Sequence, residues 1–210
     1  MARRQARRSP ISDEYTSLRR RKVCGNSRFD VFFDRIRTPT GEIVEDFLIV
    51  RPRVRVNGAV GVCVLPEVRG RIGLMRGFRH QLGMEIWQAP AGFIEPDEDA
   101  IATALRELEE ETALACTREQ LKSLGHFVPD AGLIEGVIAL YVAQDTCPST
   151  RIRKRGREIG AGTLRLFDLR QLRRLCSNSN NISGATLVAC FRYLQLRSAP
   201  ATARAASIRA

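Results

Sequence analysis

The stretch that decides the fold runs from residue 92 to residue 114 and reads GFIEPDEDAIATALRELEEETAL. Acids and a proline at 96–99 are typical of the residues just before a helix, and good helix formers follow. Glu107, Glu110 and Glu111 then stand at i, i+3 and i+4, so their carboxylates share one helical face and repel each other. Divalent cations remove such repulsion, and Mg²⁺ in particular prefers oxygen ligands and bridges carboxylates to substrate phosphates.

The three glutamates alone also fit a charged helix that faces solvent. The loop before the helix separates these interpretations, because Gly92 is followed by Glu98 and then by Arg106. The Arg106 guanidinium can pair with Glu98 and hold the loop against the helix. We therefore interpret the segment as a site rather than as a solvated surface.

This spaced pattern resembles the signature of the Nudix hydrolase family. The matching positions are Gly92, Glu98, Arg106, Glu107, Leu108, Glu110, Glu111 and Leu114. The chain departs at Ala113, where the family has the glycine that ends the helix and often takes a positive φ. Because Ala113 removes no metal ligand, the departure predicts strain or a different helix end, and does not by itself argue against activity.

The flanking sequence is similar to the ADP-ribose and ADP-sugar pyrophosphatase branch of that family. The similar segments are 27–50, RGFRH at 76–80, EIWQAPAGFIE at 85–95, Pro129 about fifteen residues past the signature, and 182–194. The signature of the coenzyme A branch is not found before the helix. The resemblance covers roughly residues 24–196 and implies hydrolysis of ADP-ribose or a related ADP-sugar to AMP and a sugar phosphate.

The resemblance also implies roles for particular residues. Mg²⁺, with Mn²⁺ as the alternative, would be held by the three glutamates of the helix, with the Ala91 carbonyl as an extra ligand, and Glu110 and Glu111 would take part in catalysis. Glu158 would orient or deprotonate the attacking water, with Glu135 as the fallback. Arg79 is the candidate for gripping the diphosphate, and Glu85 is expected in the same pocket. Gly92, Glu98 and Arg106 are expected to support the site.

The order of elements predicts an α/β fold with a mixed sheet between helices, which the resemblance identifies as the Nudix α/β/α sandwich. Apolar runs predict strands near 58–65, 72–79, 137–143 and 164–167, and helices over 168–176 and 184–197. Residues 23–50 are expected to form an N-terminal β-hairpin that joins two subunits, and 51–197 the Nudix domain. Residues 1–22 and 198–210 are expected to be a disordered basic arm and a disordered tail.

The formal net charge of +11 is unusual and unevenly spread. Residues 1–22 hold eight Arg or Lys against two acids, and residues 151–174 hold nine against two. Solvated basic segments are the favoured interpretation, with nucleic acid as the less favoured partner. Six cysteines without CxxC spacing argue against a zinc site and suit a reducing compartment.

We therefore expect a cytoplasmic homodimeric hydrolase of a nucleoside diphosphate sugar, with no membrane contact. Organellar targeting by the Arg-rich N-terminus is less favoured, because that segment also carries Asp13 and Glu14. Three alternatives stay open. These are hydrolysis of another nucleoside diphosphate derivative such as GDP-mannose, NADH or capped RNA, a non-catalytic module that senses ADP-ribose, and an RNA-processing enzyme or RNA-binding protein, which the net charge suggests. Intact acids argue against a pure sensor, which has no need of three metal ligands.

Overall fold

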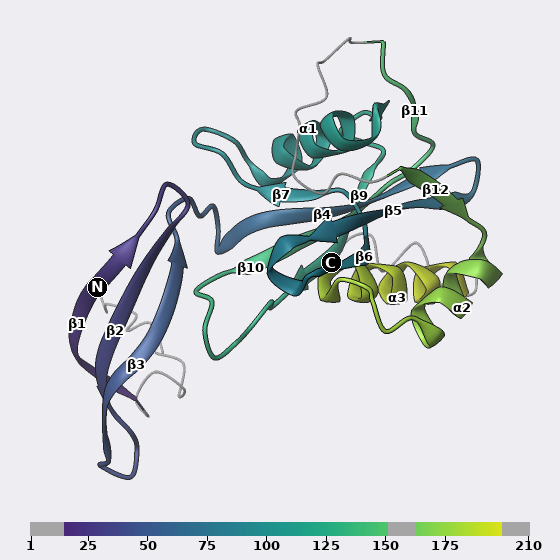
Figure 1. Cartoon of the computed structure of the whole chain (residues 1–210). Coiled ribbons are helices and arrows are strands. Elements are labelled where there is room, and N and C mark those ends of the chain that lie inside the picture. The colour runs from purple at the N-terminus through teal and green to yellow at the C-terminus, as the bar shows by residue number, and fades with distance from the viewer. Residues whose placement is uncertain (1–14, 151–162, 199–210) are drawn as a thin grey trace, which may run out of the picture. The chain divides into compact units, whose positions relative to one another are not determined.

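The computed structural model describes residues 15–150 and 163–198 (Figure 1). Glu158, most of the expected basic arm and nearly all of the expected tail therefore lie outside the described residues. The chain divides into an N-terminal unit, residues 1–53 with 130–135, and a main unit, residues 54–129 with 136–210. In the described ranges, no helix is both long enough and apolar enough to cross a membrane.

The N-terminal unit is built on an antiparallel sheet in the order β1-β2-β3. The expected hairpin is present as its second and third strands, but a strand precedes it and includes residues 16–22, which were expected to be disordered. That expectation was wrong because the many charges of this segment have partners in the sheet. Arg20, for example, donates three hydrogen bonds to the buried Asp34, at 2.8, 3.1 and 2.6 Å. The strands are β1 Thr16–Gly25, β2 Phe29–Arg37 and β3 Ile43–Pro52.

The main unit confirms the predicted α/β class with a mixed sheet. The sheet runs in the order β12-β5-β4-β10-β9, with β6 paired to β5 and β7 paired to β4. The central pair β10–β4 is parallel and its neighbouring pairs are antiparallel. Its strands are β4 Ala59–Val68, β5 Arg71–Arg79, β6 Met84–Gln88, β7 Ala91–Phe93, β9 Leu121–Phe127, β10 Val137–Ala143 and β12 Leu164–Phe167.

Helices cover both faces of this sheet, with α1 on one side and α2 and α3 on the other, as Figure 1 shows. The α1 side packs through a cluster that includes Val62, Val64 and Leu108, and the opposite side through one that includes Leu65 and Tyr193. Alternate residues of β4 serve the two clusters, as the period of a strand requires. The helices are α1 Ala100–Thr112, α2 Leu169–Asn178 and α3 Gly184–Ser198.

Two short strands and a turn of 3-10 helix complete the main unit, and none of the three was predicted from the sequence. The strands β8 Leu114–Ala115 and β11 Cys147–Pro148 pair with each other just after α1. The turn η2 His80–Leu82 joins β5 to β6. Cys63 and Cys190 are buried, as their apolar surroundings predicted, and all six cysteines are free thiols.

Candidate functional site

Helix α1 presents the glutamates because its other side is fixed to the sheet. Asp99 caps its N-terminus, with the Asp99 carboxylate accepting the Ala102 N–H at 2.6 Å. Ala104 and Leu108 are completely buried against β4. With the apolar stripe held inward, the helical period turns the i, i+3 and i+4 carboxylates toward the side of β7.

Glu107 is the most buried of these glutamates, and Gly92 in β7 makes room for it. Glu107 is 4% exposed. A Cβ built on Gly92 would lie 1.9 Å from the Glu107 Oε1 atom, far inside van der Waals contact. The sequence shows this glycine as a break before the helix. Its role in the structure is to leave a space that a carboxylate fills.

Arg106 ties the loop, the helix and the strand together. Its guanidinium donates to Glu98 at 2.9 and 3.0 Å, to Glu107 at 2.6 Å and to Glu110 at 3.2 Å. It also donates to the Phe93 carbonyl at 3.1 Å. The predicted Arg106–Glu98 pair is therefore present, and Arg106 in addition binds two of the proposed metal ligands.

These contacts change the acidity of the groups that make them. The Arg106 hydrogen bond, opposed by partial burial, holds the pKa of Glu98 below its ordinary value of 4.5. Burial acts to lower the pKa of Arg106, but its hydrogen bond with Glu98 and the charge of Glu107 raise that pKa overall. Both groups are charged at neutral pH, so the pair is a permanent ionic support for the glutamate face.

Glu111 completes the face by reaching β7. Its Oε2 atom accepts the Ala91 N–H at 3.3 Å. Pro90 and Ile94 hydrogen-bond to β4, through the Pro90 carbonyl at 2.8 Å and the Ile94 N–H at 3.2 Å. Successive residues of a strand direct their backbone groups to alternate edges, so those of Ala91 point to the edge away from β4. Because a strand residue directs its N–H and its carbonyl to the same edge, this arrangement supports the carbonyl of Ala91 as a ligand.

The donors fit a hard divalent cation. All three side-chain donors are carboxylate oxygens, the backbone donor is a carbonyl oxygen, and these are the atoms that Mg²⁺ and Mn²⁺ bind. Within residues 15–150 and 163–198, no three His, Cys, Asp or Glu side chains converge on one point as a preformed cage. Mg²⁺ keeps several waters and shares substrate oxygens, so a fully closed protein cage is not required.

Ala113 ends α1 in the left-handed conformation, with φ 57° and ψ 25°. Its N–H bonds the Glu109 carbonyl at 2.9 Å, so the helix end keeps a regular hydrogen bond. The strain predicted from the sequence is therefore present in the backbone, and it costs on the order of 1 kcal/mol for a residue with a Cβ. No carboxylate of the face depends on this residue.

The structure does not bring Arg79 and Glu85 together. On the β5–β6 ladder, Glu85 stands opposite Phe78 and Arg79 stands opposite Met84, so their side chains leave opposite faces of the hairpin. Glu85 forms a half-exposed ion pair with Arg76 at 3.3 Å. Arg79 instead donates to the buried Gln88, a residue that the sequence reading missed. An isolated polar residue at the end of an apolar strand is the signal that could have identified it.

The structure supports neither candidate for the catalytic base with a described contact to the glutamate face. Glu158 lies outside the described residues. Glu135 belongs to the N-terminal unit, where it is ion-paired with Arg51 at 2.9 Å and with Arg20 at 3.6 Å. The described structure therefore places the glutamate face, and the identity of the base stays a prediction.

Comparisons with known proteins agree with this geometry. Residues 56–182 match the model of the NUDIX domain. The chain is 37% identical over 111 residues to the methanol dehydrogenase activator of Bacillus methanolicus, covering 53% of this chain and 56% of that protein. It is 26% identical over 132 residues to the ADP-ribose pyrophosphatase of Bacillus subtilis strain 168, covering 63% and 67%.

The matched part thus spans about half to two thirds of these curated relatives. Among solved structures, that of an ADP compounds hydrolase superposes with a TM-score of 0.71 at 20% identity, covering 89% of this chain and 97% of that one. At this identity the superposition establishes the fold alone.

Proposed function

The chain belongs to the NUDIX family, and on that premise we propose that it hydrolyses the diphosphate bond of ADP-ribose or a related ADP-sugar. The single observation that carries the proposal is the glutamate face of α1, in which Glu107 fills the space left by Gly92 and Arg106 supports it. The ADP-ribose pyrophosphatase among the relatives supports the choice of substrate. The products would be AMP and a sugar phosphate.

Each residue has a defined task in this proposal. Glu107, Glu110 and Glu111, with the Ala91 carbonyl, would hold Mg²⁺ or Mn²⁺. The bound cation supplies neutralisation of the diphosphate and a lower pKa for the attacking water. Arg106 fixes the Glu107 and Glu110 carboxylates through its hydrogen bonds.

The chemistry at the diphosphate is the addition of water across one P–O–P linkage. Glu158 would take a proton from the attacking water as its oxygen bonds to one phosphorus. The bridging oxygen leaves with the other phosphate. Arg79 would bind the diphosphate oxygens, for which a guanidinium offers paired donors. Because Glu85 is ion-paired with Arg76 on the other face of the hairpin, a part for it in the same grip has no support from the described geometry.

A product panel tests the function directly. The protein is incubated with Mg²⁺ and with ADP-ribose, ADP-glucose, GDP-mannose, NADH, diadenosine polyphosphates and capped RNA, and products are separated by chromatography. We expect AMP and ribose 5-phosphate from ADP-ribose, dependent on the cation and abolished by EDTA. Preferred hydrolysis of another substrate would replace the proposed one, and absence of turnover with all of them would favour a sensing module.

The catalytic base has its own test. Glu158→Gln is expected to lower kcat by about 10²-fold or more, since general-base catalysis is typically worth 10²–10⁴-fold. Glu135→Gln is the matched comparison, and it is expected to leave kcat nearly unchanged while disturbing the Arg51 pair. A loss below about tenfold for Glu158→Gln would contradict its assignment, and a large loss for Glu135→Gln would transfer the role.

We also propose that the N-terminal unit forms a homodimer. Its sheet exposes large apolar side chains, among them Val23, Phe47 and Leu48, each about 40% exposed. Phe47 and Leu48 are consecutive in β3 and lie on opposite faces, so both faces of the sheet offer apolar area to a partner. Light scattering is expected to give twice the chain mass, and a monomer would refute the proposal. A cytoplasmic location remains our expectation, supported by six free thiols, and cell fractionation tests it.

A further inference from the structure

A second surface of the main unit has a character opposite to that of the glutamate face. It lies on the α2 side of the sheet and is formed by the ends of β5, β6 and β12, by α2, and by residues 178–181. We call it the arginine face, defined by Arg76, Trp87, Arg165, Phe167, Gln171, Arg174, Asn178, Ser179, Asn180 and Asn181. None of the described residues of the hydrolytic site belongs to it.

Two open hollows meet on this face. One has a volume of about 380 Å³ and is lined by Arg165, Phe167 and Arg174 among others. The second has a volume of about 330 Å³ and is lined by Arg76 and Trp87 with the asparagines. Both are lined by Asn178 and Ser179, so the hollows adjoin each other rather than forming separate sites.

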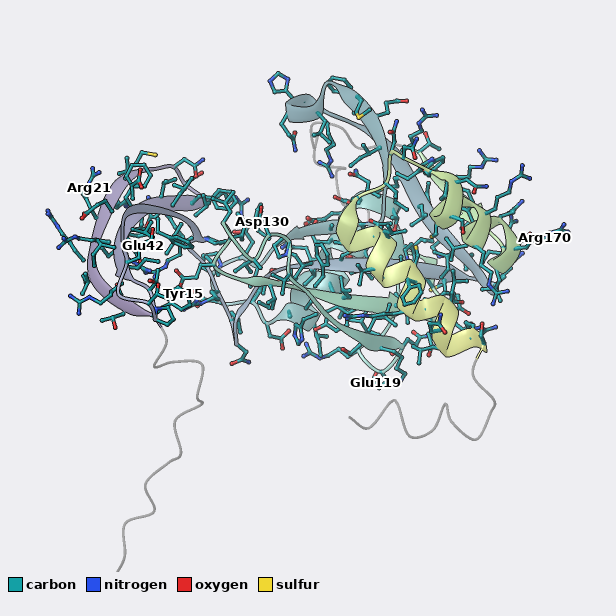
Figure 2. The ribbon with its side chains drawn as sticks, turned by 90° about the horizontal axis from the view of Figure 1, so that it is seen from below. Tyr15, Arg21, Glu42, Glu119, Asp130 and Arg170 are labelled. Atoms are coloured by element: carbon teal, nitrogen blue, oxygen red, sulfur yellow. The ribbon has the colours of Figure 1, made fainter. Side chains whose placement is uncertain are left out.

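The charge of the face is positive. Arg76 is already ion-paired with Glu85 at 3.3 Å, so Arg165 and Arg174 supply most of the free charge that lines the hollows. Helix α2 carries three arginines, at 170, 173 and 174, and no acid. Asp168, just before the helix, is occupied as its N-cap and accepts the Gln171 N–H at 2.7 Å. Figure 2 shows Arg170 extending from α2 away from the ribbon, where other nitrogen-tipped side chains also project. A long anion on this face would meet Arg165 and Arg174, with Arg170 one helical turn before Arg174. Arg173 lies on the α3 side of the helix, where it donates to Ser198 at 2.7 Å.

Aromatic and amide groups stand between the arginines. Trp87 is half-buried, and its ring packs edge-on against Phe167 with 5.2 Å between centroids. The Arg165 guanidinium lies over the same Phe167 ring at 5.4 Å. The hollows also present the amides of Asn178, Asn180 and Asn181. Phe167 is 7% exposed, so the flat surfaces open to a base are the Trp87 ring and the Arg165 guanidinium that covers Phe167. The amides offer both donors and acceptors to base edges.

We propose that the arginine face binds single-stranded nucleic acid, with RNA as the test ligand. Guanidinium groups spaced along a groove, interleaved with rings on which bases stack, are the features with which proteins hold a single strand without strict sequence preference. A duplex hides its bases in the helical stack, so only its phosphates could engage the arginines. The binding is independent of the hydrolytic site, because the two faces lie on opposite sides of the sheet (Figure 1).

Trp87 makes the test direct, because it is the only tryptophan of the chain. A 20-nucleotide oligo(U) RNA is titrated into the full-length protein, while tryptophan emission and the anisotropy of a fluorescein label on the RNA are followed. We expect saturable binding with quenching of Trp87 emission. With four or five phosphate contacts, log K should fall against log[salt] with a slope of roughly −3, since each contact to a single strand contributes about −0.7.

Matched variants separate this face from general positive charge. The triple change Arg165→Gln, Arg170→Gln and Arg174→Gln is expected to weaken binding at least tenfold and to leave hydrolysis unchanged. The control, Arg19→Gln, Arg21→Gln and Arg37→Gln, removes the same charge from exposed positions of the N-terminal unit and should change affinity less than twofold. If the first variant does not fold, Arg174→Gln alone is expected to weaken binding two- to fourfold.

Several outcomes would overturn the proposal. These are absence of RNA binding, equal losses in both triple variants, and binding that leaves Trp87 emission unchanged. Inorganic polyphosphate and a 20-base-pair RNA duplex are further arms of the experiment. If either quenches Trp87 and binds as tightly as oligo(U), the face recognises only polyanions, and the single-strand assignment is wrong.

Discussion

Helices α1 and α2 pack on opposite faces of the same sheet and present opposite charges. The carboxylates of α1 are held by Gly92, Arg106 and β7 within a segment of about twenty residues. The arginines of α2 face solvent, and the hollow beside them draws on strands far apart in the chain. The difference teaches that a surface built from one loop and one helix can be predicted from residue spacing in the sequence. A surface assembled from several strands can be recognised only in the folded structure.

The largest expected effect tests the acidic side of this comparison. Glu111→Gln removes one charge from the face, so metal-dependent hydrolysis of ADP-ribose should fall on the order of 10³-fold, as when a group that stabilises the transition state is lost. Steady-state kcat measured with Mg²⁺ in excess checks it. Glu109→Gln, in the same helical turn but hydrogen-bonded to Ser149, is the control and should stay within about threefold. Equal losses in the two variants would contradict the ligand assignment.

The next effect concerns the space that shapes the acidic face. Gly92→Ala would force Glu107 away from β7, because the added Cβ would overlap its carboxylate. We expect a destabilisation of about 1–3 kcal/mol in urea unfolding and a loss of activity on the order of 10²-fold. Gly132→Ala is the matched control, since its Cβ would meet only the Asp130 Oδ1 atom at 3.5 Å. Unchanged activity in Gly92→Ala would show that Glu107 does not need its position.

A smaller effect concerns the ion pair that supports the same face. The folded-state pKa of Glu98 lies below its ordinary value of 4.5, so the pair stabilises the fold at neutral pH. This contribution is lost as pH falls through 4.5 toward the folded-state pKa. Glu98→Gln should therefore lower Tm at pH 7 and flatten the decline of Tm between pH 5 and 3. The control is Glu42→Gln, at an exposed turn, and identical pH curves for wild type and Glu98→Gln would exclude this role.

The smallest effect is expected at the end of α1. Ala113→Gly relieves the left-handed backbone at φ 57°, so stability should rise by about 1 kcal/mol and Tm by about 2–4 °C. Activity should not change, because Ala113 contributes no group to the face. Calorimetry checks the stability and the ADP-ribose assay checks the activity. A fall in Tm would show that the alanine packs favourably enough to offset its strain.

The sequence predicted the acidic face well because its contacts are local. The Arg106–Glu98 pair and the common face of Glu107, Glu110 and Glu111 follow from helical period and from a loop of fixed length. The apolar run at 58–65 likewise predicted a buried strand, and β4 is buried along nearly its whole length. In both cases the residues that determine the structure are neighbours in the chain.

Predictions failed where pairing is long-range. Strand β1 carries four consecutive basic residues, and only its pairing with β2, where Arg20 meets the buried Asp34, explains why it is ordered. Glu85 and Arg79 are close in sequence, yet the β5–β6 register sends them to opposite faces. Sequence spacing cannot fix strand register when both faces of a hairpin carry polar residues.

The fit of Glu107 against Gly92 also explains why the number of residues between the signature positions of α1 is fixed. The Glu107 carboxylate occupies the space that a methyl group on residue 92 would fill, so it fixes the rotation of α1 relative to β7. An insertion or deletion inside α1, between Ala100 and Glu107, would rotate Glu107 by about 100° per residue relative to the start of the helix and turn its carboxylate away from Gly92. The interval from Glu98 to Arg106 therefore determines which face of α1 Glu107 occupies. The Arg106–Glu98 pair in turn fixes where the loop from Gly92 meets the helix.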